Sequence, residues 1–272
     1  MKDKKLTALS SKLLSKLREK SKNWFTIKEV YDLFPDIPPK SISQQLMRMT
    51  NDGLLMRIKE SVYYMIPFEQ DSECYLPNWH LIAEPLAGNE HYVGYYSAMQ
   101  IHSLITQPAL TEQIVVPKQT KPTWVEIRKV NFQFIYHNDK HFFGYKKVWI
   151  DDFNRVLCSD LEKTFIDCLY KPEYAGGTVE VAKALHMARE RINDDRLLSY
   201  ALKFGSQAVI KRLGYLLDLL NINTPLIEEL HKLRTSSITL LDTGAPERGK
   251  VSTKWSIKQN VDTHTILSSI LT

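Results

Sequence analysis

The segment from residue 24 to 66 constrains the fold most, because it contains a short helix with a clear start and a clear end. Pro39 is tolerated in the first turn of a helix, and Gly53 is the residue type best suited to the left-handed conformation that closes one. At 100° per residue, the apolar side chains of this helix fall on one side. These side chains are Ile42, Leu46 and Met49. We therefore predict that they anchor the helix to a small core.

The other side of this predicted helix combines cations with side chains that hydrogen-bond. Cations attract phosphates, whereas Gln and Arg can read the edges of bases. We expect Gln44 and Arg48 to contact bases, with three neighbours close to the nucleic acid. These neighbours are Lys40, Ser41 and Gln45.

The flanking sequence supports this interpretation. Thr26 and Glu29 have the spacing of a capping box, which starts a helix, and the prolines of residues 35–38 end it. Two β-prone runs then surround the short polar turn at residues 60–61, which indicates a hairpin. Helix, helix, turn, helix and hairpin is the order of a winged helix-turn-helix, and the resemblance covers the first quarter of the chain. The alternative is a small helical domain that contacts only protein.

Charge is concentrated in the same part of the chain. Residues 1–66 contain thirteen Lys and Arg against seven Asp and Glu, a net charge of +6, whereas the remaining residues carry −1. A duplex would therefore be attracted mainly to this segment, and binding should weaken steeply with salt. On the predicted hairpin, we expect Arg57 and Lys59 to contact phosphates.

The polar, mildly acidic residues 67–78 indicate a domain boundary. We predict a winged helix-turn-helix domain at residues 1–68 and a larger domain at residues 75–272. In the larger domain, short strands cluster between residues 113 and 158 and helices dominate afterwards. Because the strands precede the helices and do not alternate with them, an α+β fold is favoured over a parallel α/β sheet.

Four segments of the larger domain carry a family resemblance. Residues 161–177 contain a predicted helix with acidic residues, followed by Pro-Glu-Tyr-Ala-Gly-Gly. Residues 95–104 read Tyr-Tyr-Ser-Ala-Met-Gln-Ile-His-Ser-Leu. Residues 142–144 read Phe-Phe-Gly, and residues 242–255 start with Asp and end with Trp. Together they resemble the AbiEi-type antitoxins of type IV toxin–antitoxin systems. Ser103 and Thr243 depart from that pattern, which usually has Gly and Pro there.

The resemblance implies a function in two parts. Such proteins repress their own operon through the first domain and neutralise a nucleotidyltransferase-like toxin through the second. The expected partners are therefore double-stranded operator DNA, with inverted repeats, and the toxin, contacted directly or opposed indirectly. The resemblance also selects a set of signature residues: Glu162, Lys163, Asp167, Tyr174, Gly176 and Gly177.

Helical periodicity gives these signature residues a physical interpretation. Glu162, Lys163 and Asp167 leave the apolar side of their helix, so they are predicted to form a partner-facing surface or to be solvated charges. Gly176 and Gly177 precede a helix start, where backbone N–H groups can bind an anion. The favoured interpretation is that the two glycines only permit a bend between helices.

Enzymatic alternatives have weaker support. Residues 244–250 match the spacing of a phosphate-binding loop, but Val251 stands where Ser or Thr is required and no helix is predicted to follow. His137 and His141 lie four residues apart in a predicted solvated turn. We therefore predict a non-enzymatic regulator without metal or other cofactor. A DNA-targeted nuclease or nucleotidyltransferase-like enzyme remains an alternative, and so does a transcription factor that senses a ligand in an apolar pocket beneath Trp79, Trp124 and Trp149.

The cellular setting is predicted from what the sequence lacks. Cys74, Cys158 and Cys168 have no close spacing, which favours a reducing compartment. No apolar run approaches the ~20 residues that cross a bilayer. We expect a cytoplasmic protein without a membrane partner.

Overall fold

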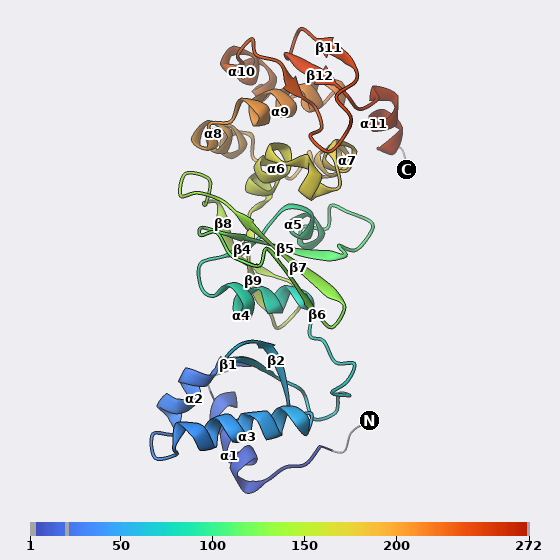
Figure 1. The fold of residues 1–272 in the computed structure, drawn as a ribbon. Coiled ribbons are helices and arrows are strands. Elements are labelled where there is room, and N and C mark those ends of the chain that lie inside the picture. Colours follow the sequence, from blue (N-terminus) through green and yellow to red (C-terminus); the bar gives the residue numbers. More distant parts are fainter. Residues whose placement is uncertain (1–3, 20–21, 271–272) are drawn as a thin grey trace. The chain divides into compact units, whose positions relative to one another are not determined.

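The computed structural model describes residues 4–19 and 22–270 of the chain. They form a mixed α+β fold with three sheets, divided into two compact units (Figure 1). Unit 1 contains residues 1–89 and 126–130, and unit 2 contains residues 90–125 and 131–272. The predicted boundary lay at residues 67–78, whereas residues 67–89 pack with unit 1. The outer ends of the predicted domains, residues 1–3 and 271–272, lie outside the described residues.

Unit 1 combines helices with a small antiparallel sheet. Its elements are α1 (Ala8–Arg18), β1 (Trp24–Thr26), α2 (Ile27–Leu33), α3 (Pro39–Asn51), β2 (Leu55–Lys59), β3 (Val62–Met65), a 3-10 turn (Trp79–Ile82) and α4 (Ala83–Ala87). The strand order is β1-β3-β2. Leu13, Phe25 and Val30 form its core with the apolar side of α3. The three-residue strand β1 was not predicted.

Local hydrogen bonds explain where the helices of unit 1 begin and end. Thr26 Oγ1 accepts a hydrogen bond from the Glu29 N–H, and the Glu29 carboxylate accepts one from the Thr26 N–H at 2.7 Å. The predicted capping box is therefore confirmed. After α3, Gly53 has a φ of +73°, and the Leu54 N–H donates to the Met49 carbonyl at 2.9 Å. A side chain at position 53 would be strained in this conformation.

Unit 2 contains most of a six-stranded sheet. Its strands are β4 (Tyr92–Val93), β5 (Thr111–Val116), β6 (Trp124–Ile127), β7 (Val130–Tyr136), β8 (Tyr145–Trp149) and β9 (Arg155–Ser159). Their order is β6-β7-β5-β4-β9-β8, so β8 is an edge strand. The β4–β9 and β5–β7 pairs are parallel, and the β4–β5 and β8–β9 pairs are antiparallel. The mixture agrees with the predicted α+β class.

The helices of unit 2 surround one central helix. They are α5 (Tyr95–Ile101), α6 (Leu161–Tyr170), α7 (Thr178–Ala188), α8 (Asp194–Phe204), α9 (Gln207–Leu219), α10 (Leu226–Leu233) and α11 (Thr263–Ser269), with a 3-10 turn at Pro172–Ala175. Helix α6 contacts α5, α7, α8, α9 and β9. Figure 1 shows it between the six-stranded sheet and the helices α8 and α9. No side of α6 is therefore left open to water.

A third sheet lies near the end of the chain. It contains β10 (Thr239–Leu240), β11 (Lys250–Ser252) and β12 (Ile257–Gln259) in the order β10-β12-β11. Residues 253–256 form the turn between β11 and β12. Within the described ranges, no helix has the length and apolarity needed to span a membrane.

Candidate functional site

The outward side of α3 is an exposed polar surface. Lys40, Ser41, Gln44 and Arg48 are all exposed. Within residues 4–19 and 22–270, none of these four side chains has an ion-pair or hydrogen-bond partner. Four of the five residues predicted on α3 are thus free to contact a ligand.

The inward side of α3 holds this surface rigidly. Ile42, Leu46 and Met49 are 1%, 0% and 0% exposed, as the helical periodicity predicted. Ser43 adds a polar link, because its hydroxyl lies 3.1 Å from that of Tyr31 on α2. Burial of three apolar side chains fixes the rotation of α3, with each contributing roughly 1.5–3 kcal/mol.

Gln45 corrects one of the sequence predictions. Its side chain is only 8% exposed, and its Nε2 donates to Thr7 Oγ1 at 3.5 Å beside the start of α1. On the helical wheel this position lies beside Met49 and Ile42, so it falls on the buried side of α3. Gln45 therefore contacts α1 and is not available to a ligand.

The two hairpin cations differ from each other. Arg57 on β2 is exposed, whereas the Lys59 ammonium donates to the Leu86 carbonyl at 2.6 Å. Partial burial lowers the pKa of Lys59. Arg57 is therefore the freer of the two cations.

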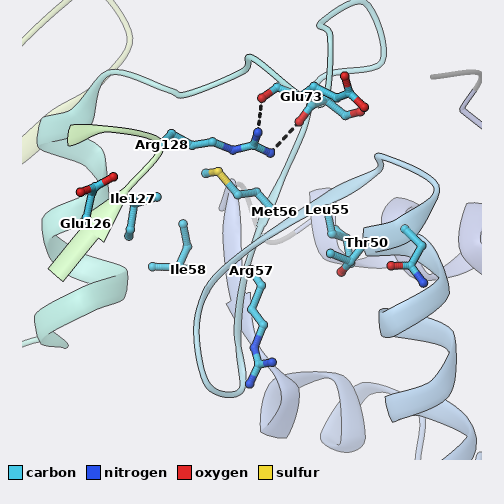
Figure 2. A pocket seen from close by; sticks show the side chains of 11 residues that line it. Thr50, Leu55, Met56, Arg57, Ile58, Glu73, Glu126, Ile127 and Arg128 are labelled. Atoms are coloured by element: carbon cyan, nitrogen blue, oxygen red, sulfur yellow. Dashed lines mark hydrogen bonds between the residues drawn. The ribbon is translucent and has the colours of Figure 1, made fainter. Parts of the chain in front are cut away.

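The polar pocket in Figure 2 lies in unit 1, beside β2 and the end of α3. It has a volume of about 450 Å³, and its lining includes Met56, Ile58, Glu126 and Arg128. Arg128 Nη2 donates to the Ser72 carbonyl at 2.6 Å, and Nη1 donates to the Glu73 carbonyl. Trp79, Trp124 and Trp149 do not line this pocket. It therefore differs from the apolar pocket that a ligand-sensing regulator was predicted to have.

The charged signature residues of α6 overturn the prediction of a surface. Glu162, Lys163 and Asp167 are 2%, 0% and 0% exposed. Periodicity placed them away from the apolar side of α6, but the other sides of this helix are covered as well. They are neither solvated charges nor a partner-facing surface.

Lys163 and Asp167 instead form a buried ion pair one helical turn apart. Lys163 Nζ also donates to the Tyr92 hydroxyl at 3.0 Å, and this hydroxyl donates to Asp167 Oδ2 at 3.0 Å. Each charge therefore has a charged partner and a neutral one. Buried charges persist only with this kind of compensation.

His137 extends this network toward Tyr95. Its Nδ1 lies 3.2 Å from the Tyr92 hydroxyl, and its Nε2 lies 2.8 Å from the Tyr95 hydroxyl. Since the Tyr92 proton points to Asp167, Nδ1 must carry the proton of the ring and Nε2 must accept from Tyr95. The network thus assigns one neutral tautomer to His137, which is 2% exposed and does not lie in a solvated turn.

Burial shifts the pKa values of this network. It lowers the pKa of His137 to about 4, while the nearby Asp167 charge opposes the shift. It also lowers the pKa of Lys163 and raises those of Tyr92 and Tyr95. At neutral pH the imidazole and both phenols are therefore uncharged. The backbone of Tyr95 has a φ of +52°, which is a strained conformation for a residue with a large side chain.

Glu162 has a structural role at the start of α8. Its carboxylate accepts hydrogen bonds from the Asn193 N–H at 2.8 Å and from Arg196 Nη1 at 3.2 Å. Asn193 is the N-cap of α8, so Glu162 links α6 to this cap. A carboxylate is stabilised at this place because the N-terminus of a helix carries a partial positive charge.

The glycine pair meets the closing segment of the chain. Gly176 and Gly177 have φ values of +75° and +90°, and α7 begins at the next residue. The Thr178 N–H donates to Asp242 Oδ2 at 2.6 Å, so an internal carboxylate occupies the start of this helix. The prediction of a bend between helices is confirmed, and the anion here is Asp242. The Thr243 hydroxyl also donates to the Glu173 carboxylate, so two segments that carry the family resemblance touch each other.

Tyr174 joins the same region to the buried network. It is partly buried, and its ring lies edge-on to that of Tyr95 with centroids 5.3 Å apart. Its carbonyl accepts a hydrogen bond from Gln113 Nε2 at 2.7 Å. Tyr174 therefore packs α5 and β5 against the end of α6.

The enzymatic alternatives have no matching local geometry. Residues 244–250 run into the strand β11, where a phosphate-binding loop needs a helix. His141 Nε2 lies 3.1 Å from the Phe204 carbonyl, and both His137 nitrogens face tyrosines. Across the part of the chain that the structure describes, no cluster of three or more His, Cys, Asp or Glu could hold a metal, and Cys74, Cys158 and Cys168 are free thiols.

Comparisons with known proteins show the fold alone. No protein-family model matches the sequence, and no curated protein is significantly similar to it. The fold resembles the crystal structure of the RV2827C protein from Mycobacterium tuberculosis, with a TM-score of 0.67 and 17% identity. The similarity covers 99% of this chain and 97% of that chain. It therefore includes both units.

Proposed function

We propose that unit 1 is a winged helix-turn-helix that binds duplex DNA through α3. The observation that carries the proposal is the exposed set Lys40, Ser41, Gln44 and Arg48, which lies on a helix held by three buried side chains. Free cations and amides on a rigid helix suit phosphates and base edges in a major groove. The element order α1-β1-α2-α3-β2-β3 and the net charge of +6 over residues 1–66 support it.

Within this proposal, Arg48 and Gln44 read bases while Lys40 and Arg57 contact phosphates. The exposed thioether of Met47, 62% accessible, lies on the same side of α3 and can contact a thymine methyl. The target is an operator in the protein's own promoter, so the protein acts as an autorepressor.

For unit 2 we propose an antitoxin function toward a nucleotidyltransferase-like toxin. The support is the resemblance of four segments to AbiEi-type antitoxins, together with the hydrogen bond between two of them from Thr243 to Glu173. The buried residues of α6 then maintain the fold of this unit, and its outer surface meets or opposes the toxin. The protein is thus a regulator that performs no chemistry.

Two readouts in one cell test the division of labour. The full-length protein and its Arg48→Ala variant are expressed beside a promoter reporter and the gene of the proposed nucleotidyltransferase-like toxin. We expect Arg48→Ala to lose repression of the reporter while it still relieves growth inhibition. Loss of both activities at unchanged protein level would contradict two separable functions, and unchanged repression would contradict the role of α3.

A further inference from the structure

The β8–β9 hairpin exposes aromatic and cationic side chains at the edge of the six-stranded sheet. Side chains alternate between the two sides of a strand, so Tyr145, Lys147 and Trp149 share one side of β8. Arg155 pairs with Trp149 in the antiparallel register, and its guanidinium lies 3.7 Å from the centre of a Trp149 ring. This side of the edge thus alternates aromatic and cationic groups.

The aromatic groups of this hairpin are unusually exposed. Trp149 is 54% exposed, and Phe153 in the connecting turn is 88% exposed. Asp151 fixes the turn, because its carboxylate accepts the N–H groups of Phe153 and Asn154 at 2.9 and 2.8 Å. Phe153 is therefore held in water by a defined turn. Such exposure of large apolar rings usually marks a binding surface.

The cations of this hairpin also lack anionic partners among the described residues. Lys146, Lys147 and Arg155 have no ion pair or hydrogen bond with any residue of the described ranges. Lysines on an edge strand can simply prevent pairing with another sheet. That role does not explain why Trp149 and Phe153 are exposed beside them.

We infer that the β8–β9 hairpin binds single-stranded RNA. Bases stack on Trp149 and Phe153, while Lys147 and Arg155 attract the phosphates, which is the combination that single-strand binding proteins use. Bases of a duplex are already stacked on both faces, whereas RNA presents unpaired bases in loops and at ends. This surface is separate from α3, so the proposal of RNA binding does not depend on the proposed repressor function.

Anisotropy of a labelled RNA tests this inference on the full-length protein. The probe is a fluorescein-labelled RNA of about 20 nucleotides, longer than typical single-strand sites, made only of A and C so that it cannot pair with itself. We expect salt-sensitive binding that the double substitution Trp149→Ala with Phe153→Ala weakens by about tenfold or more. Trp149→Phe alone should retain most of the affinity, because it keeps a stacking ring.

Trp124 provides a matched control on the opposite edge of the same sheet. It is 49% exposed on β6, so Trp124→Ala removes a similar ring from another surface and should leave RNA affinity unchanged. Arg48→Ala should also leave it unchanged. Thermal melts of all variants check that the fold is retained.

Several outcomes would overturn the inference. These are the absence of RNA binding, an equal loss with Trp124→Ala, or a loss with Arg48→Ala and not with the hairpin variants. Binding of the DNA strand of the same sequence without binding of the RNA would also overturn it. If the hairpin variants lost only a complex with the proposed toxin, the surface would be a protein-docking site.

Discussion

Helices α3 and α6 both carry charged side chains opposite an apolar stripe, yet they place these charges in opposite environments. On α3, Lys40 and Arg48 are exposed, whereas on α6 Lys163 and Asp167 are fully buried. One side of α3 is exposed to solvent, whereas α6 is covered by the sheet and by other helices. The same sequence pattern therefore produces an exposed polar surface in one unit and an internal polar network in the other.

The largest difference between the two helices should be in stability. Asp167→Ala leaves the Lys163 ammonium buried without its counter-charge, which should lower the free energy of unfolding by about 3–5 kcal/mol. Urea denaturation measures the loss. Glu229→Ala, which breaks the exposed pair with Lys232, is the control and should cause no measurable change. A loss after Asp167→Ala as small as that of the control would show that the network does not hold α6.

The pH dependence of stability should also come from the α6 network. In the unfolded chain, His137 takes up a proton as the pH falls below 6.5, the ordinary pKa of histidine. In the folded protein its pKa is about 4, so the ring stays neutral down to that pH. Stability is therefore full above pH 6.5 and decreases toward pH 4, by about 2 kcal/mol between pH 7 and pH 5.

Denaturation at both pH values checks this, with His137→Gln as the comparison. The variant keeps a neutral hydrogen-bonding side chain but cannot titrate. Its stability should change less between the two pH values than that of the natural protein. Equal pH dependence in both proteins would show that His137 is not the group responsible.

Helix α3 should respond to substitution through binding and not through stability. Arg48→Ala should weaken binding to the operator by about 1–3 kcal/mol and relax specificity at one base pair. The urea midpoint should be unchanged, because Arg48 has no partner among the described residues. Arg18→Ala on α1 removes another exposed cation and is the control. Equal effects of the two substitutions would mean that general charge, and not α3, governs binding.

The smallest expected effect comes from the hairpin of unit 1. Arg57→Ala should lower affinity for all duplex sequences alike and reduce the salt slope by about 1. Anisotropy with operator and unrelated duplexes at several salt concentrations measures both quantities. A change confined to the operator sequence would instead make Arg57 a base-reading residue.

The sequence was sufficient for elements whose signals are local. The capping box at Thr26, the limits of α3 and the buried stripe through Leu46 depend on neighbours within one or two helical turns. The α+β class also followed from the order of strands and helices. By contrast, β1 and β4 have three and two residues, and such short strands have no periodicity to detect.

The environment of α6 could not be predicted because it depends on distant segments. Tyr92 and Asp167 are 75 residues apart in the sequence. Helical periodicity finds the most apolar side but cannot say whether the other sides are covered. One signal was present, since Lys163 and Asp167 have the spacing of an ion pair within a helix that is otherwise largely apolar.

The most direct measurement of the central proposal is a salt titration of the full-length protein on a duplex from its own promoter. If α3 and the adjoining hairpin contact phosphates, the logarithm of the association constant should fall linearly with that of the salt concentration, by about 0.9 for each contact. Arg48→Ala should then bind more weakly across the whole titration. Affinity that is absent, independent of salt, or unaffected by Arg48→Ala would contradict a DNA-binding role for α3.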